Sequence, residues 1–235
     1  MCSNFQPVRT AERMKRFLAS TEAPPECPAE TWPGYLAPYI CRDLDAPSHA
    51  FERQLRMGQF GMVPSWAKDT KIGRQTYNSR SETAADKPSF RQAWRRGQRA
   101  IIPVECVFEP FYDGQEAKPV RWKISHVDDQ PLGIAGLWEW CPTLRVESFT
   151  MLTVNADQHP LMNRFHKPGE EKRMVTILDP TDYDRWLDCP VGDMPSMMTR
   201  YPAHLLQAMP AGVPDQRRKR QVTDAATPEL DLGLD

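Results

Sequence analysis

Short strand-like segments follow one another through the middle of the chain, and this pattern most constrains the fold. Five of them are rich in β-branched and aromatic residues: Arg99–Val104, Val120–His126, Leu132–Trp140, Ser148–Val154 and Arg173–Leu178. A parallel doubly wound sheet needs a helix between successive strands, and the sequence offers few helices here. We therefore predict one α+β domain around a mainly antiparallel, curled sheet.

The segments before this region are predicted to be mixed. Thr10–Ala19 has apolar residues at helical spacing (Met14, Phe17 and Leu18), which predicts an amphipathic helix. Residues 21–50 carry many prolines and alternate poorly, which predicts a long ordered loop. Arg53–Val63 alternates like a strand and stops at Pro64.

Two further helices are predicted from their start signals. Ser89 and Gln92 have the spacing of a capping box, and the helix they begin is expected to bury Phe90 and Trp94. Its other face then carries three arginines, Arg91, Arg95 and Arg99. Asp179-Pro180 begins a short helix with proline in its first turn, and this helix is expected to pack three apolar residues, Tyr183, Trp186 and Leu187.

Composition bounds the class of protein and its location. The 235 residues include 30 basic and 31 acidic side chains, for a formal charge of −1. This balance excludes a polycation that binds nucleic acid by bulk charge, but it allows a basic groove. No stretch reads as a signal peptide or reaches transmembrane length, so a cytoplasmic protein is expected. We predict a domain over residues 1–212 and a disordered polar tail over 213–235.

The six cysteines do not indicate disulfides or zinc. A cytosolic chain is kept reduced, and the sequence has no CxxC, HExxH or close Cys/His pair. No metal and no cofactor are expected. Five of the cysteines are interpreted as ordinary thiols, and Cys2 is the exception.

Met1 is followed directly by Cys2. If Met1 is removed, Cys2 carries a free α-amine and a thiol, a pair that no internal cysteine has. With an amine pKa of ~7.7–8 and a thiol pKa of ~8.5, both groups are partly deprotonated near neutral pH. Such a 1,2-aminothiol condenses with an aldehyde, since the amine forms an imine and the sulfur closes a thiazolidine ring. The dipeptide alone is weak evidence.

Three other segments carry polar residues suited to chemistry, although each alone is typical of a surface loop or strand end. The run 77–83 holds Asn78, which donates and accepts, and Arg80, whose planar fork suits phosphate or carboxylate. Glu109 lies among apolar neighbours at a strand end, where desolvation favours its protonated form. His166 lies in the run 163–168 and is a candidate proton carrier.

Together these segments resemble the SOS-response-associated peptidase (SRAP) family of abasic-site processing proteins. The resemblance rests on the Met-Cys start, Asn-x-Arg-x-Glu-Thr at 78–83, Ile-Pro…Phe-Glu at 102–109, His…Arg-Met at 166–174, and Gly-Met-Val-Pro-Ser-Trp-Ala-Lys at 61–68. It covers roughly residues 1–190, and the order and spacing of the motifs are specific.

The resemblance implies a compact α+β domain with a barrel-like sheet and a role in the DNA damage response. Met1 would be removed and Cys2 would crosslink covalently to the aldehyde of an abasic site in single-stranded DNA, with possible lyase and autopeptidase activity. Asn78 would hold the N-terminal residue or substrate, and Arg80 would bind a phosphate. Glu109 would act as general acid and base, and His166 would stabilise the developing alkoxide and imine.

The resemblance also decides between neighbouring candidates. Glu109 is preferred to Glu105 because the family glutamate follows an aromatic residue. His166 is preferred to His159 because it lies just upstream of the 173–174 run.

The chain departs from the family pattern at several positions. Ser3-Asn4 stands where Gly-Arg is usual, so a basic contact near Cys2 is missing. Pro110 replaces a common tryptophan, Val175 replaces a common proline, and Ser65 stands where some relatives have a second aromatic residue. We expect a divergent subgroup that keeps the chemistry.

A positive groove with aromatic platforms is typical of single-strand binders. The candidates for this groove are Arg80, Trp66 and the arginine face formed by Arg91, Arg95 and Arg99. The expected partner is single-stranded DNA that contains abasic sites. No membrane partner is expected, and the chain is expected to be a monomer that associates with the nucleoid when bound to DNA.

Two alternatives stay open. The first is a thiol peptidase in which Cys2 is the nucleophile and His166 the base, acting on Met1 or on other proteins. The second is a single-stranded-DNA-binding module without chemistry, which the departures at Asn4 and Pro110 motivate.

Overall fold

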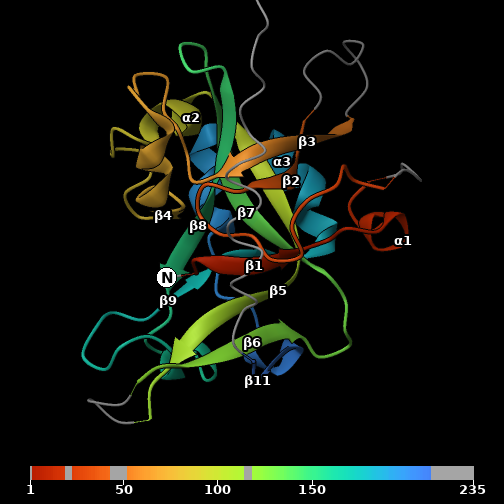
Figure 1. The fold of residues 1–235 in the computed structure, drawn as a ribbon, viewed down its shortest axis with the longest axis vertical. Coiled ribbons are helices and arrows are strands. Elements are labelled where there is room, and N and C mark those ends of the chain that lie inside the picture. The colour runs from red at the N-terminus through yellow and green to blue at the C-terminus, as the bar shows by residue number, and fades with distance from the viewer. Residues whose placement is uncertain (1, 19–22, 43–51, 114–117, 213–235) are drawn as a thin grey trace, which may run out of the picture.

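The computed structural model describes residues 2–18, 23–42, 52–113 and 118–212. Within these ranges eleven strands form one sheet (Figure 1). The strands are β1 Asn4–Pro7, β2 Leu36–Arg42, β3 Arg53–Phe60, β4 Asn78–Arg80, β5 Arg99–Phe111, β6 Val120–His126, β7 Leu132–Cys141, β8 Val146–Asn155, β9 Arg173–Val175, β10 Ile177–Leu178 and β11 Leu206–Pro210. The predicted tail lies outside the described residues.

Helices are few and short, as expected for an α+β chain dominated by strands. The α-helices are α1 Ala11–Met14, α2 Arg91–Arg95 and α3 Tyr183–Asp188, and 3₁₀ turns cover Thr70–Arg74, Met162–Arg164, Pro180–Asp182, Val191–Met197 and Ala203–Leu205. None of the helices in the described ranges has the length and apolar character that crossing a membrane requires.

The sheet curls until it nearly meets itself. Neighbouring strands follow the order β10-β7-β8-β3-β2-β5-β6-β11, and β5 also pairs with β7. β2 and β5 pair at one position, Ile40 with Ile101. The sheet is therefore curled rather than a true closed barrel. The pairings are antiparallel apart from the parallel contacts β3–β8 and β4–β8. The predicted fold class is confirmed.

β5 connects the two parts of the sheet because it is long. Its first half pairs with β7, and its second half pairs with β6 on one side and β1 on the other. Figure 1 shows β5 running from the curled part of the sheet into the lower extension with β6 and β11. The N-terminal strand is therefore attached to the second half of β5.

Each face of the curled sheet buries its own apolar cluster. On β5, Ile102 joins one cluster with Phe60 and Phe149, whereas Ile101 joins the other with Trp186. Successive strand residues point to opposite faces, which explains this division. Trp186 of α3 also donates from Nε1 to the Ala100 carbonyl at 2.8 Å, so the helix is fixed to β5 by a polar contact as well.

Several local predictions hold, with shifted ends. α1 begins after Thr10, whose hydroxyl caps it, and the three predicted apolar residues of this segment are buried. α3 buries its predicted apolar residues as well. The predicted strand Arg173–Leu178 divides into β9 and β10 because it changes partner at Thr176, from β8 to β7.

Other predictions are wrong. The proline-rich stretch 21–50 contains β2, which is a full strand despite Pro38. Ser89 does not cap α2, which begins after Phe90 without a side-chain cap. Arg99 is not on the helix: it opens β5, is buried, and donates to the Cys189 and Leu187 carbonyls at 2.5 and 3.0 Å.

A close approach of two glycines fixes the turn after β3. Gly61 has φ +107°, and a Cβ there would lie 2.1 Å from the Gly73 carbonyl oxygen. Both the backbone conformation and the space therefore require glycine.

We predict that Gly61→Ala lowers the free energy of unfolding by roughly 2–4 kcal/mol, because it adds backbone strain and a steric overlap. Urea unfolding followed by fluorescence measures the change. Gly192→Ala is the control, since an added Cβ there meets no atom within 4 Å. Equal stability of the two variants would mean that the turn accommodates a side chain at Gly61.

Candidate active site beside the N-terminal strand

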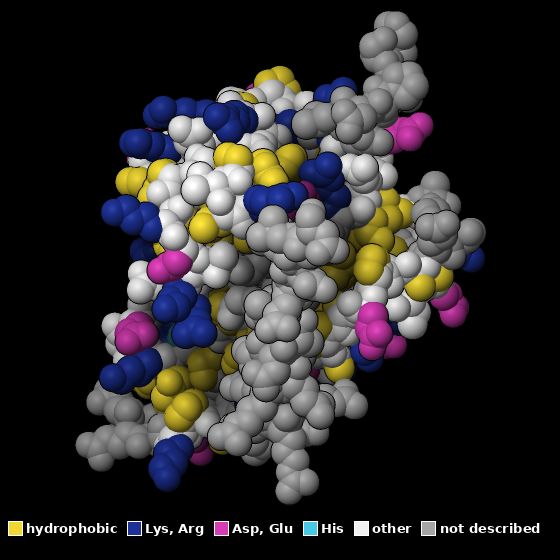
Figure 2. Space-filling model, turned by 45° about the horizontal axis from the view of Figure 1, so that its top comes forward, with side chains coloured by type: hydrophobic (Ala, Val, Ile, Leu, Met, Phe, Trp, Pro, Cys, Tyr) yellow, Lys and Arg dark blue, Asp and Glu magenta, His cyan; other side chains and the backbone are white. Residues whose placement is uncertain are grey.

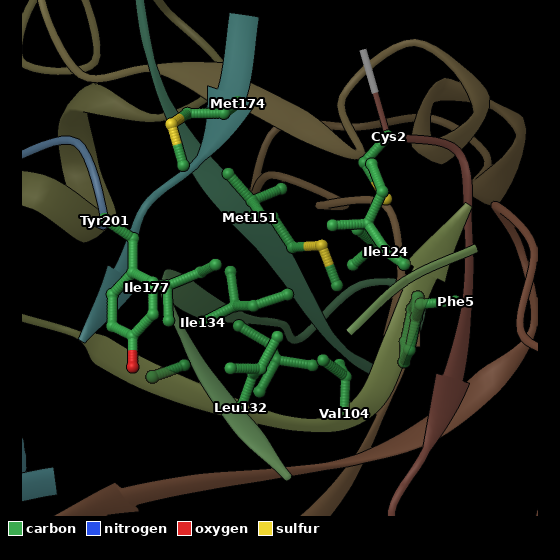
Figure 3. Close-up of a cluster of buried hydrophobic side chains, with 14 of the residues drawn as sticks. Cys2, Phe5, Val104, Ile124, Leu132, Ile134, Met151, Met174, Ile177 and Tyr201 are labelled. Carbon is green, nitrogen blue, oxygen red and sulfur yellow. The ribbon is translucent and has the colours of Figure 1, made fainter. Parts of the chain in front are cut away.

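Cys2 lies immediately before β1 and is almost completely buried, with 1% of its surface exposed. Figure 3 shows its side chain at the edge of the apolar cluster that contains Ile124 and Met151. Its Sγ donates to the Asn4 carbonyl at 3.4 Å. Burial raises the pKa of the Cys2 thiol far above its ordinary value, and the charge of Glu109 raises it further. The thiol is therefore neutral in this state.

Asn78 connects β4 to Cys2. β4 pairs with β8 in parallel, with Asn78 opposite Met151. Its Nδ2 donates to the Cys2 carbonyl at 2.6 Å. Its Oδ1 is buried and accepts no hydrogen bond from the described residues. A buried acceptor without a donor is costly, so this oxygen is poised to accept one.

Glu109 lies on the second half of β5, opposite Trp122 of β6, and only 2% of its surface is exposed. Burial raises the pKa of its carboxyl, and His166 opposes this rise in part. Glu105 has a different environment, since it pairs with Arg13 at 2.5 Å and stays partly exposed. Of the two glutamates, Glu109 is the one whose charge acts on the Cys2 thiol.

His166 reaches Glu109 from a loop that is fixed to the end of β5. Its backbone N–H donates to the Pro110 carbonyl at 2.9 Å, and its backbone has φ +65°, which is unusual for a residue with a side chain. Nδ1 lies 3.5 Å from Glu109 Oε2. Pro110 therefore still positions His166, although it replaces a common tryptophan, because it binds His166 through its backbone carbonyl.

The hydrogen bonds of His166 define its tautomer. Nε2 lies 2.9 Å from the Arg173 carbonyl, and a carbonyl only accepts, so Nε2 carries a proton. In the neutral ring Nδ1 is then an acceptor that faces Glu109. Burial favours the protonated form of the Glu109 carboxyl, and His166 Nδ1 is 3.5 Å from its Oε2.

His159 has a structural role instead. Its Nε2 contacts the Tyr201 carbonyl at 2.8 Å, and its Nδ1 accepts from the backbone of Leu161 and Met162. It is buried by these contacts.

The predicted DNA-contacting residues lie on exposed parts of three segments. Arg80 ends β4, two residues beyond Asn78, and pairs with Glu171 at 2.7 Å. Trp66 is 53% exposed, and its Nε1 donates to the Pro88 carbonyl at 3.3 Å. Arg91 and Arg95 are exposed on α2. Figure 2 shows Lys and Arg side chains along the left side of one face, with acidic side chains between them.

Two residues near the site were not predicted. The pKa of Tyr77 is raised by burial and then by the charges of Cys2 and Glu109, which places its hydroxyl in their field. Arg121 of β6 donates to Asn4 Oδ1 at 2.5 Å and lies over the Phe108 ring at 3.3 Å. Tyr77 could have been found from the sequence, because it directly precedes the motif at 78–83. Arg121 could not, because only the pairing of β6 with β5 brings it near the site.

Two cavities in the described residues lie apart from Cys2, Asn78, Glu109 and His166. One of about 530 Å³ is lined by Ser81, Glu82, Val154, Asn155, Pro195, Met198, Thr199 and Arg200. The other, of about 250 Å³, adjoins it around Thr199 and Arg200. In the described ranges no three His, Cys, Asp or Glu side chains are grouped to hold a metal ion, and all six cysteines are free.

Proteins named for abasic-site processing are similar in sequence. The abasic site processing protein YoqW of Bacillus subtilis (strain 168) is 32% identical over 137 residues, which cover 57% of this chain and 58% of that protein. The abasic site processing protein HMCES of Xenopus tropicalis is 29% identical over 168 residues, covering 62% of this chain and 48% of that protein. The match thus spans about half to three-fifths of each relative.

Solved structures share the fold. A protein from Bordetella bronchiseptica superposes with a TM-score of 0.80 and 37% identity, covering 90% of this chain and 100% of that one. A protein from Bacteroides thetaiotaomicron superposes with a TM-score of 0.73 and 18% identity, covering 90% and 92%. The family model described as SOS response associated peptidase (SRAP) matches residues 1–213. The chain belongs to the SRAP family.

Proposed function

We propose that this chain processes abasic sites in single-stranded DNA by forming a covalent adduct through Cys2 after Met1 is removed. The observation that carries the proposal is the meeting of four distant segments. Asn78 holds the Cys2 carbonyl, Glu109 lies on the strand that β1 joins, and His166 reaches Glu109 from the loop fixed to the end of that strand. Membership of the SRAP family and the names of the relatives support the same substrate.

The proposed reaction needs no oxidant, reductant or metal. The free α-amine of Cys2 adds to the aldehyde carbon of the ring-opened sugar, and loss of water gives an imine. The thiol sulfur then adds to the imine carbon and its proton passes to nitrogen, which closes a thiazolidine. One water leaves for each crosslink formed.

The residues beside Cys2 fit the proton transfers of this reaction. Because burial favours the protonated form of Glu109, its carboxyl can donate a proton to the departing hydroxyl, which leaves as water. The proton that the nitrogen then loses can pass through His166 Nδ1 back to Glu109. The unpartnered Oδ1 of Asn78 is suited to accept from the freed amine and to orient it. These groups act in a site from which water is largely excluded, where such contacts are stronger.

The proposed path of the DNA follows the exposed arginines. Arg80 would bind a phosphate beside the lesion, since it continues the strand that carries Asn78. The exposed ring of Trp66 is suited to stack on a base, and Arg91 and Arg95 add positive charge on α2.

We predict that Cys2→Ala abolishes the adduct with abasic single-stranded DNA, because the aminothiol is lost. Intact mass and a denaturing gel measure the adduct after loss of Met1. Cys106→Ala is the matched control, since Cys106 is also a buried thiol, on the neighbouring strand, and should keep the adduct. Adduct formation by Cys2→Ala would overturn the proposal. Peptide turnover without DNA would favour the thiol peptidase.

We also predict a pH-dependent stability difference between the native chain and Glu109→Gln. Above the ordinary carboxyl pKa of 4.5 the unfolded chain loses the Glu109 proton while the folded chain keeps it. The native chain then loses stability relative to Glu109→Gln by about 1.4 kcal/mol per pH unit, until the raised folded pKa is reached.

Urea unfolding from pH 4 to pH 8 measures this difference. Glu170→Gln is the control, because it makes the same change at an exposed position. A difference for Glu109→Gln that does not change with pH would mean that Glu109 ionises freely in the folded chain.

A further inference from the structure

Arg80 does not present a bare guanidinium to solvent. Its Nη1 lies 2.7 Å from Glu171 Oε2, although half of the Arg80 side chain is exposed. Arginine recognises carboxylate and phosphate with the same fork of N–H donors. The carboxylate of Glu171 therefore occupies the kind of position at Arg80 that a backbone phosphate would take.

Glu171 lies between two guanidinium groups. Its Oε1 accepts from Arg173 Nη1 at 2.8 Å and from Asn155 Nδ2 at 3.3 Å, while its Oε2 faces Arg80. The pKa of its carboxyl is lowered, first by the hydrogen bond from Arg173. Glu171 is thus a charged anion held at the end of β4.

The buried positive charge of Arg173 has a carboxylate partner other than Glu171. Arg173 is buried, and its Nη1 and Nη2 contact the two carboxylate oxygens of Glu82 at 3.0 and 2.8 Å. Nη2 also donates to the Thr153 carbonyl at 2.6 Å. If the Glu171 side chain moves away, the buried cation keeps a carboxylate partner, and the group that gains a free face is Arg80.

The backbone at Glu171 is held independently of its side chain. The next residue, Lys172, donates from its backbone to Asp157 Oδ1 at 2.8 Å, and its Nζ donates to the His166 and Lys167 carbonyls at 3.1 and 2.8 Å. A side-chain movement at Glu171, one third of which is exposed, therefore needs no change in the loop that carries His166.

We propose that Glu171 is an internal competitor for the DNA phosphate at Arg80, and that single-stranded DNA binds by displacing its carboxylate. This inference rests on the proposed function and adds the residue that sets the affinity for the DNA backbone. A partly exposed ion pair is weak, so a phosphate can replace it. The exchange sets one carboxylate free, which recruits a cation and reduces the net release of counterions.

The test compares Glu171→Gln with Glu170→Gln in the full chain. Both remove one negative charge at adjacent positions, so their long-range effects on DNA are matched. The probe is an undamaged single-stranded oligonucleotide, and fluorescence anisotropy at several salt concentrations gives the dissociation constant. Glu171→Gln is expected to bind about two- to fivefold more tightly than Glu170→Gln. The plot of the logarithm of its association constant against log[salt] should be steeper than that of Glu170→Gln by up to about 0.7.

A double variant ties the effect to Arg80. In an Arg80→Gln background, Glu171→Gln should bind no more tightly than Glu170→Gln, and a gain over Glu170→Gln that persists there would overturn the inference. Equal affinities of Glu171→Gln and Glu170→Gln would also overturn it. If Glu171→Gln does not fold, Glu171→Asp serves instead, since it keeps the charge but shortens the reach to Arg80 and is expected to bind more tightly than the native chain.

Undamaged DNA separates this inference from the proposed function. Native chain that binds the oligonucleotide and crosslinks abasic DNA, with no difference between the two glutamine variants, would overturn only the role of Glu171. Absence of DNA binding in every variant would overturn both.

Discussion

The antiparallel pairing of β1 with β5 is the contact on which the candidate site depends. Asn4 is registered opposite Phe108, so the chain just before β1 runs beside Glu109 and Pro110. Phe5 fixes this register from the apolar side, since it is fully buried and packs edge-on against Phe60 at 5.1 Å. A slip of one residue would turn Phe5 out of the core, and the core therefore also fixes the position of Cys2.

The same burial that fixes the strand makes the site chemically unusual. Glu109 and Cys2 are both removed from water, so their neutral forms are favoured at pH values where exposed groups would be charged or begin to ionise. The unusual φ of His166 and the unpartnered Oδ1 of Asn78 lie in the same region. Local strain and unsatisfied polar atoms of this kind concentrate where a fold serves chemistry rather than stability.

Arginine has two different uses in this chain, and burial separates them. Arg99 and Arg173 are buried and bind carbonyl or carboxylate groups that connect elements of the fold. Arg80, Arg91 and Arg95 are exposed, and Arg80 is paired with Glu171 at the surface. Arg121 is partly buried and also connects elements of the fold, because it holds Asn4 and so supports the N-terminal strand from β6.

The α+β class, most of the central strands and the buried apolar residues of the α1 and α3 segments could be predicted from the sequence, because these depend on local alternation and periodicity. It missed β1, β2, β4 and β11. These strands are short or contain proline, and they form because a distant partner satisfies their backbone groups. The motifs also named the candidate residues, but the contacts of Glu109 with His166 and of Arg80 with Glu171 follow from no local pattern. They depend on long-range pairing: β4 and β9 both pair with β8, and the His166 backbone binds the Pro110 carbonyl at the end of β5.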